Sequence, residues 1–211
     1  MLIAGSFLKI QDSKEKIDKL NDVVDQIHYD IMDGKFTEKP TLNLNILKEN
    51  TKDITKPIDI HLMVNNIKWY IDNVLSINPE YITFHIEATS SPMTYIKYIK
   101  GKNIKVGLAV NPETDFDEIY EYLDDIDLVL IMSVPPGDGG RPFIDVSDKI
   151  EKLIDFRERN DLSYIIEVDG GINDKTIKLI KKADISVVGS FITNSDDYKS
   201  KVDILRRSLH E

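Results

Sequence analysis

The sequence predicts an α/β protein built as a single (β/α)8 barrel, or TIM barrel, over residues 1–211, and three observations support this fold class. Eight apolar, β-branched runs recur along the chain, amphipathic segments separate them, and polar residues stand at the same end of each run. A length of 211 residues suits one such barrel and leaves no room for a second domain. The active site is therefore expected at the carboxyl-terminal ends of the strands.

Each apolar run has the length of a β-strand, and a helix-like segment follows it. This alternation continues to the carboxyl terminus without a linker or a low-complexity stretch. The expected strands are Leu2–Leu8, Gln26–Met32, Ile58–Val64, Tyr81–Ile86, Lys105–Val110, Leu128–Val134, Tyr164–Val168 and Ile185–Val188.

The segments between the strands carry spaced aliphatic residues and begin with acidic or capping residues, as helices laid on the outside of a sheet do. Asp145–Asn160 and Asp174–Lys182 are the clearest expected helices. The weakest unit lies between Gly34 and Lys56, where Pro40 and several asparagines leave only a short helix around Leu44–Lys48.

The composition excludes several classes of function. Lys+Arg 27 against Asp+Glu 37 gives a net charge of −10, and nucleic-acid or anionic-membrane partners need a basic surface instead. Without cysteine, every metal ligand must be an imidazole or a carboxylate. No apolar run approaches the roughly 20 residues of a membrane span, and Met1–Leu8 lacks the basic start of a signal peptide, so we expect a cytoplasmic protein.

Polar residues mark the carboxyl end of every expected strand. In a closed parallel barrel these ends meet around one mouth, so side chains far apart in the sequence would come together there. These residues are Ser6, His28, Asp30, His61, His85, Asn111, Ser133, Asp169 and Ser190.

Four of these residues would form a metal site with two nitrogen and two oxygen ligands. His28 and Asp30 are two apart on one strand and so face the same side, while His61 and Asp169 come from the third and seventh strands. Such a set suits one divalent ion, whether zinc, iron, manganese or cobalt. The alternatives are a hydrogen-bonded core histidine in each case and, for Asp169, a turn aspartate before two glycines.

A metal held there could polarise a carbonyl and stabilise the enediolate left when a neighbouring carbon loses its proton. If Asp30 and Asp169 stood on opposite faces of that enediolate, one could remove the proton and the other could return it. The result is inversion at one carbon without a redox cofactor.

Three glycine-containing loops in the second half are candidates for binding phosphate through backbone N–H groups, although glycines also serve in tight turns. Near the strand ends, Met32, Met63 and Met132 would either line the site or fill the core. The loop residues are Gly137, Asp138, Gly139 and Gly140 after strand six, Gly170 and Gly171 after strand seven, and Gly189 and Ser190 after strand eight.

These residues in this order resemble the ribulose-phosphate 3-epimerase family over nearly the whole chain. The matching motifs are Ser6, His28-Tyr-Asp-Ile-Met-Asp-Gly34, His61-Leu-Met63, Gly107-Leu-Ala-Val-Asn-Pro-Glu-Thr114, Met132-Ser-Val134, Gly137-Asp-Gly-Gly140, Glu167-Val-Asp-Gly-Gly171 and Gly189-Ser190.

The resemblance implies a barrel that interconverts D-ribulose 5-phosphate and D-xylulose 5-phosphate, with His28, Asp30, His61 and Asp169 as metal ligands. It further implies that Asp30 and Asp169 are the paired acid and base, that Ser6 and His61 contact the substrate, and that the glycine loops hold its phosphate. It also suggests a homo-oligomer, although no interface can be identified from one chain.

Two loops depart from the family pattern. Pro135, Asp138 and Arg141 stand where the family usually has asparagine, phenylalanine and glutamine, and Thr37-Glu-Lys-Pro40 replaces a Val-Pro-Asn segment; Gly5 also replaces a proline. Because Asp138 would repel a nearby phosphate, we hypothesise that Arg141 supplies a compensating charge.

Three other functions stay open. A 3-epimerase acting on a six-carbon ketose phosphate such as D-allulose 6-phosphate would use the same residues. Related barrel decarboxylases and aldolase-like synthases carry Asp-x-Lys where this chain has Asp59-Ile-His61, which favours an epimerase. A catalytically silent sugar-phosphate binding protein is expected to have lost an acid/base carboxylate, and both aspartates are present.

Overall fold

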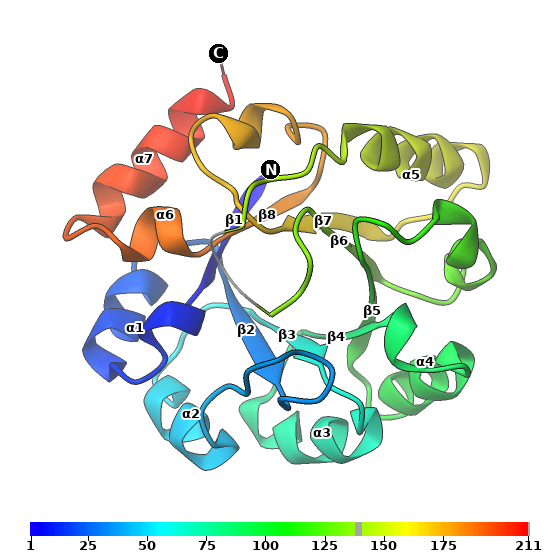
Figure 1. Cartoon of the computed structure of the whole chain (residues 1–211), viewed down its shortest axis with the longest axis horizontal. Helices are drawn as coiled ribbons and strands as arrows, with labels where there is room; N and C mark the ends of the chain where they lie inside the picture. The colour runs from blue at the N-terminus through cyan, green and yellow to red at the C-terminus, as the bar shows by residue number, and fades with distance from the viewer. Residues whose placement is uncertain (138–140, 211) are drawn as a thin grey trace.

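The protein folds as a closed barrel of parallel strands surrounded by helices (Figure 1), which confirms the predicted fold class. The structure is a computed structural model and describes residues 1–137 and 141–210. Each strand pairs with the next along the chain, and β8 closes the barrel against β1. The strands are β1 (Leu2–Ser6), β2 (Gln26–Met32), β3 (Ile58–Met63), β4 (Tyr81–His85), β5 (Lys105–Val110), β6 (Leu128–Met132), β7 (Ile165–Asp169) and β8 (Ile185–Val188).

The strand limits agree with the prediction to within two residues. The largest differences are at the ends of β1 and β6, where the apolar run continues past the strand. After β1, for example, Leu8 already begins a 3-10 helix, η1 (Leu8–Ile10), so apolar character alone placed the end of the strand too late.

Helices and short 3-10 turns connect the strands around the outside (Figure 1). The expected helices near residues 44 and 145 are present with shifted ends. The α-helices are α1 (Lys14–Asn21), α2 (Leu44–Thr51), α3 (Ile67–Val74), α4 (Pro92–Lys100), α5 (Ser147–Arg159), α6 (Ser190–Thr193) and α7 (Tyr198–Ser208). The remaining 3-10 helices are η2 (Leu75–Ile77), η3 (Ile86–Ala88), η4 (Phe116–Glu118), η5 (Tyr120–Tyr122) and η6 (Thr176–Lys178).

The helix predicted over Asp174–Lys182 was wrong. This segment contains only the three-residue η6, followed by turns in which a backbone N–H bonds to the carbonyl three residues earlier. Ile177 and Ile180 are both fully buried, and residues three apart share one face in a 3-10 turn. The side chain of Asn173 also accepts from two backbone N–H groups of the first turn, which fixes the turn locally.

The two-residue repeat of each strand divides the core into two parts. On β2, Ile27, Tyr29 and Ile31 belong to the large cluster between strands and helices. The alternating His28 and Asp30 therefore face the inside of the barrel. The same alternation directs polar side chains of β3, β4 and β7 into the barrel. The barrel interior toward the carboxyl-terminal ends of the strands is therefore polar.

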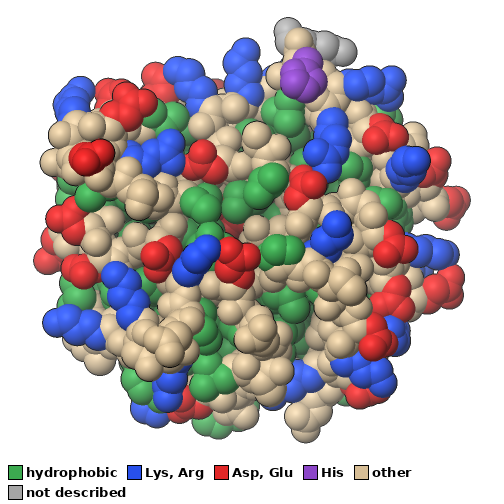
Figure 2. Space-filling model, turned by 180° about the vertical axis from the view of Figure 1, so that it is seen from behind, with side chains coloured by type: hydrophobic (Ala, Val, Ile, Leu, Met, Phe, Trp, Pro, Cys, Tyr) green, Lys and Arg blue, Asp and Glu red, His purple; other side chains and the backbone are tan. Residues whose placement is uncertain are grey.

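The outer surface mixes both signs of charge. On the face opposite to that of Figure 1, acidic and basic side chains are interspersed without a large area of one sign (Figure 2). Within residues 1–137 and 141–210, none of the helices has the length and apolar character of a membrane span.

Candidate active site

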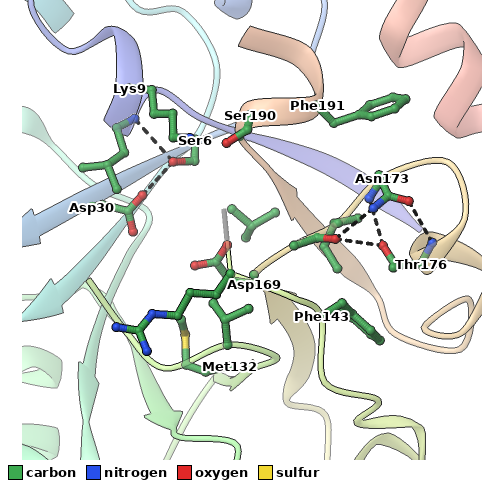
Figure 3. A pocket seen from close by; sticks show the side chains of 18 of the residues that line it. Ser6, Lys9, Asp30, Met132, Phe143, Asp169, Asn173, Thr176, Ser190 and Phe191 are labelled. Carbon is green, nitrogen blue, oxygen red and sulfur yellow. Dashed lines mark hydrogen bonds between the residues drawn. The ribbon is translucent and has the colours of Figure 1, made fainter. Parts of the chain in front are cut away.

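A cavity of about 460 Å³ opens at the carboxyl-terminal ends of the strands. Ser6 at the end of β1, Asp30 on β2 and Asp169 at the end of β7 all line it, and both carboxyl groups point into it (Figure 3). Between β2 and β7 lie β1 and β8, so the two aspartates enter from separate parts of the barrel wall. The strand ends thus bring these side chains together as the sequence predicted.

The two predicted histidines lie beside these carboxylates and are fully buried. Donor atoms of His28, Asp30, His61 and Asp169 all lie within 4.8 Å of one another. Oδ1 of Asp30 is 3.1 Å from Nδ1 of His61 and 3.3 Å from Nε2 of His28, and these two ring nitrogens are 3.3 Å apart. Four such atoms could hold one metal ion, because each can present a lone pair to a shared point.

The two aspartates have different pKa values. Burial disfavours the charge of Asp30, but the His28 and His61 rings outweigh it and lower the pKa of this carboxyl group. Burial, reinforced by the charge of Asp30, raises the pKa of Asp169 to about 7. Ser6 fixes the other oxygen of Asp30, since its hydroxyl donates to Oδ2 at 2.6 Å. A carboxyl group with a pKa near neutral pH beside an ionised one suits an acid and base pair.

Two buried carboxyl groups, on the side of this cluster nearer the amino-terminal ends of the strands, were not predicted as site residues. Oδ2 of Asp59 lies 2.8 Å from Nδ1 of His28, close but not aligned as a hydrogen bond, and Oε1 of Glu167 lies 3.9 Å from the same nitrogen. Burial, together with the charge of Asp59, raises the pKa of Glu167 well above its usual range. Asp59 and Glu167 each stand two residues before a predicted ligand, so the two-residue strand repeat could have revealed them.

A second set of contacts extends from His61 away from the cavity. Its Nε2 lies 2.8 Å from Nε2 of His85 at the end of β4, and Nδ1 of His85 lies 3.1 Å from Oε2 of Glu87 in η3. Burial lowers the pKa of His85 to about 4. Burial opposes the charge of Glu87, but hydrogen bonds from His85, Thr114 and Asn111 lower its pKa to about 2. Glu87 was not among the predicted site residues.

The glycine loops surround the outer part of the cavity. Gly170 and Gly171 have φ of +115° and +62°, values that an L side chain rarely adopts, and a Cβ on Gly170 would lie 2.6 Å from Cγ2 of Val134. Gly137, Gly189 and Ser190 also line the cavity, whereas the predicted Asp138, Gly139 and Gly140 lie outside the described residues.

The methionines divide between the lining and the core. Met63 and Met132 line the cavity, while Met32 is 5 % exposed and is not among the residues that line it. Several side chains at the rim were not predicted as site residues. Among them, Asn173 and Thr176 are held to one another and to Gly171 by hydrogen bonds (Figure 3). The additional lining residues include Lys9, Phe143, Asn173, Thr176 and Phe191.

The model of the ribulose-phosphate 3 epimerase family matches residues 2–193. The chain belongs to this family. It is therefore an isomerase, a pentose-phosphate epimerase, in agreement with the resemblance found in its motifs.

Curated epimerases from distant organisms match the chain over most of its length. Ribulose-phosphate 3-epimerase of Methanocaldococcus jannaschii is 39% identical over 94% of this chain and 86% of its own. The Escherichia coli (strain K12) enzyme of that name is 36% identical over 88% of this chain and 84% of its own. The enzyme of Helicobacter pylori (strain J99) is 34% identical, covering 97% and 94%.

Solved structures share the fold at low identity. KGPDC from Streptococcus mutans has a TM-score of 0.72 and 16% identity, covering 99% of this chain and 97% of its own. A 3-hexulose-6-phosphate synthase has a TM-score of 0.68 and 16% identity, with 99% of both chains covered. At this identity the likeness concerns the barrel only.

The loops that contain Thr37 and Gly137 lie against one another at the mouth of the barrel. Thr37 is buried, and a Cβ on Gly137 would lie 2.9 Å from Cβ of Thr37. Gly137 has φ of +110°. Glycine at this position therefore permits both the backbone conformation and the close approach to Thr37. The ring of Phe36 in the same loop packs on His85, with centroids 4.9 Å apart.

Proposed function

We propose that this epimerase inverts carbon 3 of a ketose phosphate, converting D-ribulose 5-phosphate to D-xylulose 5-phosphate, by proton transfer between two aspartates through an enediolate. One observation carries the proposal: two carboxyl groups, Asp30 and Asp169, and two imidazoles, His28 and His61, converge within 4.8 Å, and the two carboxyl groups line a cavity large enough for a small sugar phosphate.

The donor set fits a divalent ion. The close approach of Asp30 Oδ1 to both ring nitrogens places several potential lone pairs around one point, an arrangement that a cation stabilises. His28, Asp30, His61 and Asp169 would hold the ion, and zinc, iron, manganese and cobalt all suit these ligands. When bound, the ion would polarise the sugar's carbonyl and stabilise the charge that develops on its oxygen.

The aspartates would move the proton. In one direction Asp30 or Asp169 takes the proton from carbon 3, and the other, already protonated, delivers a proton to the opposite face. Before an ion binds, the pKa of Asp169 lies above that of Asp30, so Asp169 is the more easily protonated carboxyl group of the pair. Ser6 would keep Asp30 oriented through its hydrogen bond to Oδ2 and contact the substrate, as would His61.

The phosphate would lie at the outer part of the cavity. Gly170, Gly171, Gly189 and Ser190 line it there, and their backbone N–H groups can approach an anion closely. The predicted contribution of Gly137 and of Asp138, Gly139 and Gly140 to this loop belongs to the same proposal.

The first test is a coupled assay on protein loaded with each candidate metal in turn, comparing D-ribulose 5-phosphate with D-allulose 6-phosphate. We expect turnover of the five-carbon sugar with incorporation of solvent deuterium at carbon 3. A higher kcat/KM for the six-carbon sugar would assign the enzyme to that substrate instead. Turnover of neither sugar, or turnover without exchange at carbon 3, would contradict the proposal.

The second test uses Asp30→Asn and Asp169→Asn with folding and metal content measured alongside. We expect interconversion to fall by at least about 100-fold in each variant, the typical contribution of a positioned acid or base. A variant that still binds metal should exchange the carbon 3 proton of only one of the two epimers, because one base remains. A two-aspartate mechanism is wrong if either variant still interconverts the epimers at near the normal rate. The exposed Asp196→Asn serves as the matched control.

A further inference from the structure

We propose that Glu87, acting through His85, holds His61 in the tautomer whose Nδ1 lone pair is free to bind a divalent cation. Glu87 would thus be a positioning residue for the site, and the inference rests on the proposed metal centre. It concerns three residues on consecutive parts of the barrel: His61 on β3, His85 at the end of β4 and Glu87 in η3.

The contacts form one continuous path. His61 Nδ1 faces the cluster, 3.1 Å from Asp30 Oδ1, and its Nε2 lies 2.8 Å from His85 Nε2. On its other side, His85 Nδ1 lies 3.1 Å from Glu87 Oε2. Both imidazoles are fully buried, whereas the Glu87 side chain is 23% exposed. Each ring therefore has a partner at each nitrogen, and water does not reach the rings.

When a cation offsets the charge of Asp30 at one end of the path, the protons can be assigned from the Glu87 end. An ionised carboxylate only accepts hydrogen bonds, and a neutral imidazole carries one N–H and one lone pair. Facing Glu87, Nδ1 of His85 must donate, which leaves its Nε2 as an acceptor. His61 must then donate through Nε2, and its Nδ1 keeps the lone pair. In the opposite arrangement, the His85 lone pair would face a carboxylate at 3.1 Å with no proton between them.

Glu87 is held in its accepting state by the loop that follows β5. Its Oε1 accepts from the backbone N–H of Asn111 at 2.8 Å and from the hydroxyl of Thr114. Two donors on one oxygen favour the charged carboxylate and leave Oε2 for His85. The side chain is thus oriented by contacts that do not involve the cavity.

Asp30 acts on His61 in the opposite sense. Without a cation, Oδ1 of Asp30 favours a proton on the facing Nδ1 of His61, so the two carboxylates at the ends of the path compete for the tautomer. A cation bound by both Asp30 and Nδ1 removes this conflict. Glu87 lowers the cost of binding, because it already favours the tautomer that the ion needs.

The test measures zinc affinity by competition with a chromophoric chelator, without substrate. Variants are Glu87→Gln, Glu87→Ala and the control Glu113→Gln, an exposed carboxylate on the loop that follows β5. A glutamine can donate as well as accept, so it no longer selects one tautomer. We expect both Glu87 variants to bind zinc about 10- to 100-fold more weakly, the usual effect of losing such an outer partner, and the control to be unchanged.

A spectroscopic measurement on the wild-type protein keeps the test valid if a variant does not fold. Long-range 15N–1H correlations of the imidazoles in the zinc-loaded protein should place the proton of His85 on Nδ1 and that of His61 on Nε2. The inference is overturned if His85 carries its proton on Nε2, or if zinc affinity in folded Glu87→Gln stays within about threefold of wild type. Failure of the wild-type protein to bind zinc would overturn the proposed metal site as well, whereas zinc binding indifferent to Glu87 would overturn this inference alone.

Discussion

The position of a residue within the two-residue strand repeat decides whether its side chain meets the cavity or the surrounding helices. His28 and Asp30 face inward for this reason, and so do Asp59 and His61 on β3. The inward polar residues form a continuous set from the cavity to buried Glu167. A residue's chemistry is therefore set by its register in the strand as much as by its type.

Arg141 and Lys9 are the cationic side chains among the described residues that line the cavity. Because Arg141 is exposed, its attraction for a phosphate is screened and worth about 1 kcal/mol. We expect Arg141→Ala to raise the KM for the phosphorylated sugar about fivefold with a smaller change in kcat, as steady-state kinetics would show. Arg141→Lys, which keeps the charge, should have less effect. An unchanged KM in Arg141→Ala would disprove the compensating role of this arginine.

At the scale of elements, helix α5 supports the loop that follows β5. Nζ of Lys149 donates to the backbone carbonyls of Asn111, Pro112 and Thr114 at 3.1, 2.6 and 2.7 Å. Burial lowers the pKa of Lys149. Since this loop also holds Glu87, the helix contributes indirectly to the order of the site.

Lys149→Met should lower the free energy of unfolding by about 1–3 kcal/mol, because three carbonyl groups lose their donor while the aliphatic stem is kept. Urea denaturation measures this difference. Lys152→Met, an exposed position on the same helix, should stay within about 0.5 kcal/mol of wild type. Equal stability of the two variants would show that the loop does not depend on Lys149.

At the scale of the whole molecule, the end of the barrel opposite the cavity carries a repeated stabilising contact. Directly before β2, β6 and β8 stand Asp25, Asp127 and Asp184. The backbone N–H of each aspartate donates to the carbonyl of a residue in the neighbouring strand, and its side-chain carboxylate accepts the backbone N–H of that same residue. These contacts tie β1 to β2, β5 to β6 and β7 to β8. Stability and chemistry thus lie at opposite ends of the barrel.

Asp184→Ala should lower the free energy of unfolding by about 1–2 kcal/mol, since Ile166 N–H loses its acceptor and Arg157 keeps only the carbonyl of Tyr164. The kcat and KM of the folded enzyme should not change, because the site is at the other end. Denaturant titration and steady-state kinetics measure the two effects separately. Asp155→Ala, which removes an exposed ion pair with Arg159, should cost less than Asp184→Ala. A drop in kcat for Asp184→Ala would contradict this separation.

The barrel and its inner cluster could be predicted from β-branched runs that have a polar residue at one end. Such a run indicates where a strand lies, and its two-residue alternation indicates which side chains face the inside of the barrel. His28, Asp30, His61 and Asp169 needed nothing beyond this pattern. Glu87 could not be found this way, since its place depends on the short η3 turn and on a loop from the next strand. The segment Asp174–Lys182 misled because its aliphatic spacing fits an α-helix and a series of 3-10 turns equally well.

The contact between Thr37 and Gly137 joins the first half of the chain to the second across the mouth of the barrel. In a chimera that took residues 33–41 from a relative and kept the remainder, a different side chain could replace Thr37. Gly137, which lies close to Thr37, would then face a side chain of another size. Recombination between members of this family should therefore exchange both segments together or leave both in place.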